Sequence, residues 1–596
     1  MAPSPITGSD GVVNLAITCD GAALPDVVQL VSIETSHGAN RIPSAIITVL
    51  DGDMPNGAFP VADQGMFKPG AVVVISAGYG AGAQQLFSGV VVRHSVRIDG
   101  DNYARLVIEC RDKALAMTVA RNSANYVDKT DQDIIAALVA AYPGLSAAVD
   151  STAVTYKELV QYNVSDWDYL VARAEANGLL VTVDAGKLTV AAPDPSAAPV
   201  LSLTYGSDLI EFEAELDARE QLATVTATSW DLVSLAVLEQ SAKPQVLTGQ
   251  GDIAAAALAG VLGVSEFALQ SAAPLDSAAL TAWTKARQTR AALARIRGRA
   301  KFQGSALAKA GAVLTLAGVG KHFNGNVIAS RVVHRIEDGN WTTEVAFGMA
   351  ADGFAEVHRL QAPLAAGLTA GIAGLHTGLV LKLDADPEGH YKIQVSVPVM
   401  KAATAGVWAR LSTYYGSAGF GAFVIPEIGD EVILGFFNND PSCPVILGSL
   451  YSSKHVPPYT PTADNNIKAL VTRSKLKMEF DDDKKVITFL TPGANKIVVS
   501  DDAKSILLND QNGNKVELGP GGILLDSPKD ITIKAGGKVL VSATQNIEAT
   551  AQMDVKIGGL NITGQAKVGF TAKGGATAEL SASGQTTVKG ALVMIN

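Results

Sequence analysis

Apolar residues recur in steps of eight near the C-terminal end of the chain, in GGILLDSPKDITIKAGGKVLVSATQNIEATAQMDVKIGG, residues 521–559. Within each step two apolar residues stand two positions apart, so they lie on the same face of a β-strand. Each octad therefore predicts one short strand and a corner. The predicted inward residues are Ile523, Leu525, Ile531, Ile533, Val539, Val541, Ile547, Val555 and Ile557 and, after a phase shift at the next two glycines, Leu560, Ile562, Val568 and Phe570.

Eight residues are too few to close one layer of a β-solenoid within a single chain. A coil with two or three sides needs about 20 residues with its corners. Three chains that wind around one another would close each layer with one octad apiece and would leave no lateral sheet edge open. We therefore predict that residues 471–596 form an intertwined trimeric β-prism, a β-helix of three chains.

Two segments far apart in the chain resemble each other. KPGAVVVISAGYG from Lys68 is followed by FSGVVV and RIDGDN, and KAGAVLTLAGVG from Lys309 is followed by FNGNVI and RIEDGN. In both, a glycine turn leads into an alternating strand, a hairpin, a β-branched strand and a charged turn. The pattern predicts two copies of a small antiparallel β-barrel, over residues 1–120 and 186–362.

Helical periodicity appears between these copies. TDQDIIAALVAAYPG begins with Thr130 and Asp133 in the spacing of a capping box, and SDWDYLVARAEANG begins at Ser165 and ends at Gly178. Apolar residues recur on one face of each segment, so both are expected to be packing helices. We assign residues 121–185 to an α/β insert.

A third helix is expected in LTAWTKARQTRAALARIRGRAKF, residues 280–302. A basic helix can follow a phosphate backbone, but no interleaved aromatic residues or known reading motif accompany this one. We therefore predict a solvated or subunit-facing surface. Its basic residues are Lys285, Arg287, Arg290, Arg295, Arg297, Arg299 and Lys301.

Short strands separated by tight turns occupy residues 376–456. Two strands flank the turn DPEG, and three more follow with turns at GSAGFG, EIGD and NNDP. Five strands over about 80 residues fit an OB-type barrel, and by strand count an SH3-like barrel fits nearly as well. Residues 363–375 and 457–470 are expected to be linkers.

Length and composition limit the number of domains and the kinds of partner that this chain can have. The chain has 596 residues, too many for one core, with 48% hydrophobic and 18% charged residues and a net charge of −11. This acidic balance argues against a general binder of nucleic acid or membrane surfaces. Cys19, Cys110 and Cys443 lie far apart and are expected to be free thiols. The opening MAPSPITGSD carries no secretory signal, so assembly in the cytoplasm is expected.

Catalytic patterns are not found in the sequence: GxSxG, HExxH and the P-loop are all absent. GSAGFG at Gly416 lacks the lysine and helix of a phosphate loop, and it is typical of a hairpin turn. Asp481 to Asp483 precede Lys484 and Lys485, which favours a solvated turn over a cation site. We therefore predict no catalytic residue, no metal site and no cofactor.

The OB-type stretch GVWARLSTYYGSAGFGAFVIPEIGDEVILGFFNNDPSCPVILGSLY resembles the OB domain of VgrG spike proteins and of the cell-puncturing spikes of contractile phage tails. YNVSDWDYLVARAEANGLLVTVDAG and the segment from Lys68 resemble the hub of the same family. In its compact size and in its sequence around SDWDYL, the chain is most similar to VgrG-like spikes of extracellular contractile injection systems.

This resemblance implies a mainly β protein with tandem hub β-barrels, a small α-helical insert, an OB-fold barrel and the C-terminal prism. It implies a non-enzymatic homotrimer whose six hub barrels form a pseudo-sixfold ring on a hexameric inner tube. The implied partners are baseplate and hub proteins, a PAAR-type tip protein at the C-terminal end, effector cargo and the target cell envelope, with no nucleic acid. The particle would be released or anchored at a membrane.

An alternative of another class is a trimeric phage-type tailspike with glycan-cleaving activity. Such an enzyme requires long coils with clustered carboxylates in a groove, which the eight-residue step disfavours. A glycan-cleavage assay on the purified chain would separate the two hypotheses.

Overall fold

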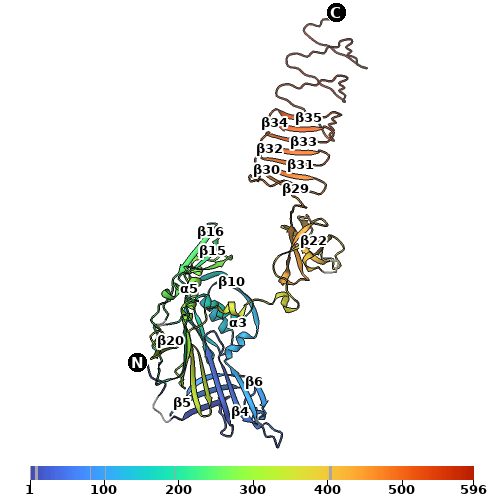
Figure 1. Ribbon diagram of the computed structural model, residues 1–596. Coiled ribbons are helices and arrows are strands. Elements are labelled where there is room, and N and C mark those ends of the chain that lie inside the picture. The colour runs from blue at the N-terminus through green and yellow to red at the C-terminus, as the bar shows by residue number, and fades with distance from the viewer. Residues whose placement is uncertain are drawn as a thin grey trace. The chain divides into compact units, whose positions relative to one another are not determined.

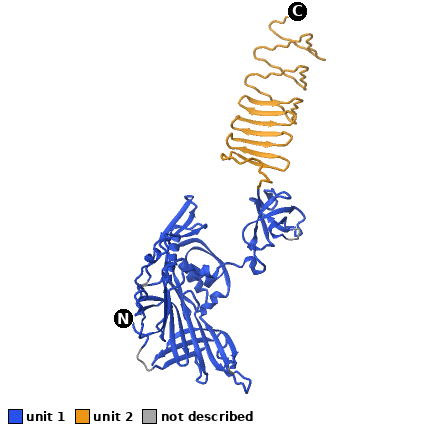
Figure 2. Ribbon diagram, in the orientation of Figure 1, with its two compact units in different colours: residues 1–450 blue, residues 451–596 orange. Residues whose placement is uncertain are grey.

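The computed structural model describes residues 2–6, 11–80, 82–100, 103–194, 196–247, 249–401 and 406–595. It divides into two compact units, Met1–Leu450 and Tyr451–Asn596 (Figure 1; Figure 2). Strands hold 39% of the residues and helices 12%, which confirms the mainly β class. Within the described ranges, we find no helix both long enough and apolar enough to cross a membrane.

The first of the two predicted barrels corresponds to a run of strands that we call the first half. Alternate side chains of these strands are buried, such as Ala45, Ile47 and Val49 along β4. They enclose a core that also includes Phe87 and Ile108. The elements are β1 (Val13–Cys19), β2 (Ala22–Ala23), β3 (Leu30–Gly38), β4 (Ser44–Asp51), α1 (Pro60–Asp63), β5 (Val72–Tyr79), β6 (Gln84–Ile98) and β7 (Ala104–Arg111).

The second predicted barrel corresponds to a second half with its own core, which includes Phe302, Leu314 and Val345. Its strands are β13 (Leu201–Thr204), β14 (Leu209–Leu216), β18 (Ile296–Gln303), β19 (Val313–Ala317), β20 (Gly325–Glu337) and β21 (Asn340–Phe347).

The two halves are joined edge to edge in one 13-stranded sheet. The order is β14-β18-β21-β20-β3-β4-β7-β6-β5-β1-β2, with β19 on β20 and β13 on β19. The junction is the antiparallel pair of β3 with β20. Ile336 and Trp341 of the second half pack in the core of the first, so the halves share buried surface as well as hydrogen bonds.

The predicted duplication is confirmed by strand order and by bulges. β5, β6 and β7 form an antiparallel meander, and so do β19, β20 and β21. The pairing of β6 with β7 shifts register between Val91 and Arg93, and that of β20 with β21 shifts between Ala329 and Arg331. A bulge is a specific local feature, so its recurrence at matching places shows that the two meanders are equivalent.

The insert contains the two predicted helices. The capping box of Thr130 and Asp133 is present at α2, and the Ser165 side chain caps α3. The predicted boundary at 185 is too early, because β12 pairs with β9 and β11, and its Leu188 and Val190 belong to the insert core. The elements are η1 (Lys113–Thr118), β8 (Arg121–Thr130), α2 (Asp131–Ala140), β9 (Ser146–Val149), β10 (Thr155–Ser165), α3 (Asp166–Ala176), β11 (Leu180–Asp184) and β12 (Lys187–Ala191).

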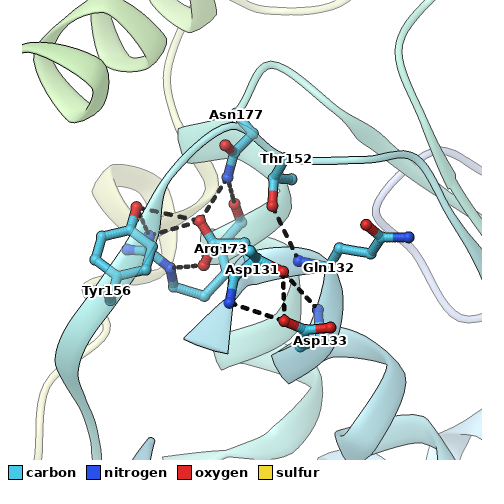
Figure 3. A network of polar contacts seen from close by, with 8 residues as sticks. Asp131, Gln132, Asp133, Thr152, Tyr156, Arg173 and Asn177 are labelled. Carbon is cyan, nitrogen blue, oxygen red and sulfur yellow. Dashed lines mark hydrogen bonds and ion pairs between the residues drawn. The ribbon is translucent and has the colours of Figure 1, made fainter. Parts of the chain in front are cut away.

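A buried ion pair ties the insert together (Figure 3). Asp131, at the start of α2, is fully buried and accepts hydrogen bonds from Arg173 Nε at 2.6 Å and from Asn177 Nδ2 at 2.7 Å. Tyr156 of β10 donates to the same carboxylate at 3.2 Å. A buried charge needs this degree of pairing to avoid a large desolvation cost, so the network fixes α2, α3 and β10 in one arrangement.

The predicted third helix is correct in its first part and wrong at its end. α5 stops at Ala294, and the last basic residues lie on strand β18. The sequence IRGRAKF in fact alternates with period two, and Gly298 is required because a Cβ there would lie 2.2 Å from the backbone oxygen of Glu213. Other elements of this region are β15 (Val225–Asp231), β16 (Ala236–Ala242), α4 (Ala255–Ala259), β17 (Phe267–Ser271), α5 (Ser277–Ala294) and α6 (Phe354–His358).

The basic residues of this segment are largely paired within the chain, which corrects the expectation of a solvated surface. Arg287 is buried on α5 and donates to the backbone oxygen of Ala351 at 3.3 Å. Arg295 donates to the backbone oxygens of Gln250 and Ile253 at 2.6 Å. On β18, cross-strand ion pairs to β14 join Arg297 to Glu215, Arg299 to Glu213 and Lys301 to Glu211.

A closed five-stranded barrel confirms the predicted OB-type fold. The strands close in the order β22-β23-β24-β28-β27 around a core that includes Val395, Val432 and Ile446. The bounds are β22 (His376–Lys382), β23 (Ile393–Ser396), β24 (Val407–Leu411), β27 (Glu431–Phe436) and β28 (Pro444–Ser449), with a hairpin of β25 (Gly416–Ser417) and β26 (Phe420–Gly421) and the short helices η2 (Leu364–Gly367), η3 (Pro398–Met400) and η4 (Phe437–Asn439).

Candidate functional site

The second unit begins with a seven-stranded antiparallel meander in which each strand has five residues and pairs with the next. It starts at Ile467, four residues before the predicted boundary of the prism. Its strands are β29 (Ile467–Val471), β30 (Lys477–Asp481), β31 (Val486–Leu490), β32 (Lys496–Ser500), β33 (Ser505–Asn509), β34 (Lys515–Gly519) and β35 (Gly522–Asp526).

The register of this meander gathers most of its large apolar residues on one face, although Val498, Leu507 and Leu524 lie on the other. Phe489 lies opposite Met478 on one side and Ile497 on the other, and Ile497 lies opposite Leu508. Residues opposite each other in neighbouring strands point to the same face. The apolar face therefore has two rows: Leu470, Met478, Phe489, Ile497, Leu508, Val516 and Leu525, and Phe480, Ile487, Val499, Ile506, Leu518 and Ile523.

Nothing in the described part of the chain covers this apolar face. Phe480 remains 37% exposed and Leu470 54%. Full burial of one such side chain contributes about 1.5–3 kcal/mol, and a sheet with one apolar face must bury it against another layer. The face is therefore a surface for association.

The opposite side of the meander includes a polar cluster that holds the preceding linker. Lys477 Nζ lies 2.9 Å from Glu479 and donates to the Tyr459 hydroxyl at 3.1 Å. Tyr459 also donates to Glu479, and this hydrogen bond, together with Lys477, lowers the pKa of the carboxyl. This side of β30 is therefore polar, and the apolar side is the one available for contact.

The predicted octad residues fall into two groups, those on a strand of the meander and those after it. Ile523 and Leu525 share the apolar face through β35. The inward residues from Ile531 to Phe570 are more than half exposed, and the described residues after Asp526 form no strand within the chain. Their role as a prism core stays a prediction.

The two-residue spacing of apolar residues predicts the pairs Ile497/Val499, Ile506/Leu508, Val516/Leu518 and Ile523/Leu525 of this face, and the two earlier pairs were missed. Met478 and Phe480 on β30, and Ile487 and Phe489 on β31, stand two apart like the octad pairs. The signal was the same pair spacing, but nine positions separate Met478 from Ile487 and ten separate Ile487 from Ile497, so a search for octads passed over these pairs.

The residues that the sequence analysis weighed as a cation site, a phosphate loop or free thiols have structural roles. Asp481 accepts a hydrogen bond from the backbone of Lys484 at 3.1 Å, and Asp482 pairs with Lys468. GSAGFG forms the β25–β26 hairpin. Cys19 and Cys110 are buried and free, and burial raises the pKa of Cys110 to about 12. Across the described ranges, no group of three or more His, Cys, Asp or Glu side chains is arranged to hold a metal ion.

A cavity of about 450 Å³ lies beside the junction of the two halves, lined among others by His37 of β3 and His334 of β20. Burial lowers the pKa of both imidazoles, that of His334 to about 3. His334 Nδ1 lies 2.9 Å from the Thr343 hydroxyl. No local pattern indicates that these two histidines line one cavity, because they are about 300 residues apart in the chain.

Two family descriptions match separate parts of the chain. Residues 9–338, more than half of its length, match the Alg8 N-terminal domain. Residues 376–451 match the type VI secretion system/phage-baseplate injector OB domain, over the same region as the closed barrel.

Curated relatives match over short segments. The actin cross-linking toxin VgrG1 of Vibrio cholerae is 43% identical over 53 residues, 9% of this chain and 5% of that protein. The type VI secretion system spike protein VgrG1a of Pseudomonas aeruginosa is 34% identical over 67 residues, 11% of this chain and 10% of that protein. The chain thus spans 5–10% of the length of these relatives, and it is VgrG-like in sequence there.

Two solved structures match this chain at low identity. A tail protein of Neisseria meningitidis has a TM-score of 0.44 and 13% identity, and covers 58% of this chain and 99% of its own. An Escherichia coli component of the type VI secretion system, described as similar to the T4 tail proteins gp27 and gp5, has a TM-score of 0.37 and 13% identity, with 73% and 99% covered. Both TM-scores lie below 0.5.

Proposed function

We propose that this chain, which belongs to the family of the Alg8 N-terminal domain, is the structural spike of a contractile injection particle. Three copies would join a hexameric inner tube to a puncturing tip and transmit the force of contraction to a target envelope. The proposal assigns the chain a mechanical role, with no catalytic residue, metal or cofactor.

The observation that carries the proposal is the uncovered apolar face of the β29–β35 sheet. A second copy offers a face with the same two rows at the same spacing, and the octads that follow supply one side of a layer per chain. Three chains would therefore close one continuous apolar column. Protein interiors pack as densely as organic crystals, so a column of dry aliphatic layers would be stiff under axial load.

The equivalent halves of the first unit support the attachment to a tube. Three chains with two halves each supply six similar units, which is the number that a hexameric tube presents. The OB-type barrel supports the same conclusion, because its sequence matches an injector domain.

The further partners we propose are baseplate and hub proteins around the six units, a PAAR-type protein at the C-terminal end of the prism, and effector cargo. Assembly would take place in the cytoplasm. The finished particle would then be released or remain anchored at a membrane.

Light scattering of the purified full chain tests the proposal. We expect the mass of three chains of 61.6 kDa each. A folded chain that stays monomeric at micromolar concentration would contradict the trimeric spike. A second measurement concerns polarity: residues 1–450, one compact unit, should bind hexameric tube protein encoded beside this chain. Binding that instead requires residues after 471 would reverse the assignment of the two ends.

A further inference from the structure

Two of the open strand edges of the 13-stranded sheet, among the described residues, belong to β14 and to the second part of β6; β2 and β13 are edge strands as well. β14 ends the sheet, and only β18 pairs with it. On β6, the partner β5 reaches only to Val90, while β7 continues to Ile98 on the other side. Residues 93–98 of β6 therefore expose one row of backbone donors and acceptors, and open edges of this kind are sites for strand addition.

These two open edges have counterparts inside the chain that are already paired with each other. β14 corresponds to β3, because the pairing of β3 with β4 shifts register between Leu30 and Ser32, and that of β14 with β18 shifts between Leu209 and Glu211. β6 corresponds to β20 by the bulges described above. The counterparts β3 and β20 form the junction of the two halves.

We propose that β14 of one chain pairs with residues 93–98 of β6 in a second copy, in the antiparallel register that joins β3 to β20. This inference rests on the proposed trimer and specifies its contact in the first unit. The junction places Glu34 opposite Arg335, Thr35 opposite His334 and Ile33 opposite Ile336.

The same register between chains is set by the matching bulges. It places Glu213 opposite Arg97, Ala214 opposite Val96 and Phe212 opposite Ile98. Each position on β14 lies 179 residues after its counterpart on β3, as Leu30 and Leu209 show.

Exposure on the two strands supports this pairing. At the internal junction His334 is 3% exposed and Ile336 5%, because β3 covers that edge. Their counterparts Val96 and Ile98 are 44% and 68% exposed. Two apolar side chains at an open edge are unfavourable in water, and a strand added in the proposed register would cover both.

Charge is also complementary along the proposed contact. Glu213 and Arg97 are largely exposed and would form the counterpart of the 2.9 Å ion pair between Arg335 and Glu34. One like-charged pair arises, Glu211 opposite Asp99. Each of these two carboxylates already has a basic partner within its chain, Lys301 for Glu211 and Arg105 for Asp99, both at 2.9 Å.

The same strand pairing, repeated within and between chains, explains how the halves would form a closed ring. If the joint between chains equals the joint between halves, every half is related to the next by the same rotation. A head-to-tail contact of this kind forms a ring when the rotation closes, and six halves make a ring of three chains.

Disulfide trapping in the full chain tests the register. We expect Ala214→Cys with Val96→Cys, in a background in which the exposed Cys443 is replaced by serine, to give covalent dimers and trimers on mild oxidation. The matched control, Ala214→Cys with Ser95→Cys, shifts the pairing by one residue and points the thiols to opposite faces. We expect it to remain mainly monomeric in denaturing gels.

Hydrogen exchange on the unmodified chain gives a second measurement that needs no variant. Amides of residues 93–98 that point away from β7 should exchange slowly in the assembled protein. Fast exchange there, or equal crosslinking of the two cysteine pairs, would overturn the strand pairing even if light scattering shows a trimer. A monomer by light scattering would instead refute the proposed function, so the two failures are distinguishable.

Discussion

Arg335 on β20 and Glu34 on β3 form an ion pair, with 2.9 Å between Nε and Oε2, across the junction of the two halves. The two residues are about 300 positions apart in the sequence, and they lie directly opposite each other in the ladder. The pair marks where two equivalent halves become one sheet.

The Glu34–Arg335 pair should contribute little to stability. Both side chains are well exposed to solvent, and exposed pairs contribute about 0.2–1 kcal/mol. We expect Arg335→Gln to lower the free energy of unfolding by less than about 1 kcal/mol. A double-mutant cycle with Glu34→Gln, measured by urea denaturation, checks this. A coupling energy that stays large in high salt would show that the junction depends on this pair.

The buried His334 should make the first unit less stable in acid. Burial lowers its pKa from 6.5 to about 3. Below about pH 6.5 the unfolded chain takes up a proton that the folded chain refuses, so the free energy of unfolding falls as pH falls. Between pH 7 and pH 4.5 this residue should account for a loss of about 2–3 kcal/mol.

The matched variant for this effect is His334→Gln, which has no titrating group and can still bond to Thr343. Urea denaturation at both pH values should show a smaller loss for this variant than for the unmodified chain. The same loss in both proteins would mean that His334 takes up its proton in the folded state.

Breaking the buried pair of Asp131 and Arg173 should be costly. Asp131→Asn keeps the shape of the side chain but leaves the Arg173 guanidinium buried without a counter-charge, and such losses cost about 3–5 kcal/mol. Asp133→Asn, at the exposed capping box of the same helix, should have a much smaller effect. Thermal unfolding of the two variants compares them. Equal shifts in Tm would indicate that the network of Figure 3 is not a stabilising feature.

The apolar face of the meander should be sensitive to charge and its other side should not. Ile506 and Ser505 are neighbours on β33, and Ile506 belongs to the apolar face while Ser505 points away from it. A carboxylate buried in an apolar contact costs several kcal/mol. We expect Ile506→Asp to weaken the trimer in light-scattering dilution series and Ser505→Asp to stay near the unmodified chain. The reverse ranking would place the contact on the opposite face.

The octads offer a second matched pair. Ile547→Asp would place three carboxylates together on the axis of the predicted prism, where burial and mutual repulsion both disfavour the charged form. We expect lower resistance of the trimer to heat and detergent, most strongly above neutral pH. Thr544→Asp, outside the inward pair of the same octad, should meet water and change little. Identical melting curves for the two variants would show that the octad register is wrong.

Local patterns in the sequence determined much of this protein. The capping box at Thr130, the turns of the OB-type barrel and the two copied segments needed only residues close in the chain, and the structure has all three. The octad spacing predicted same-face pairs, and the register confirms this for Ile523 and Leu525. Such features are local because period, cap and turn chemistry act within a few residues.

Only the tertiary structure decided how the edges meet. The pairing of β3 with β20, the end of α5 before Ile296 and the burial of His334 depend on contacts between segments tens to hundreds of residues apart. Strand edges carry the same backbone donors and acceptors whatever their sequence, so a sequence pattern cannot say which edge joins which. That choice follows from which pairing also buries apolar side chains, and burial exists only once the chain has folded.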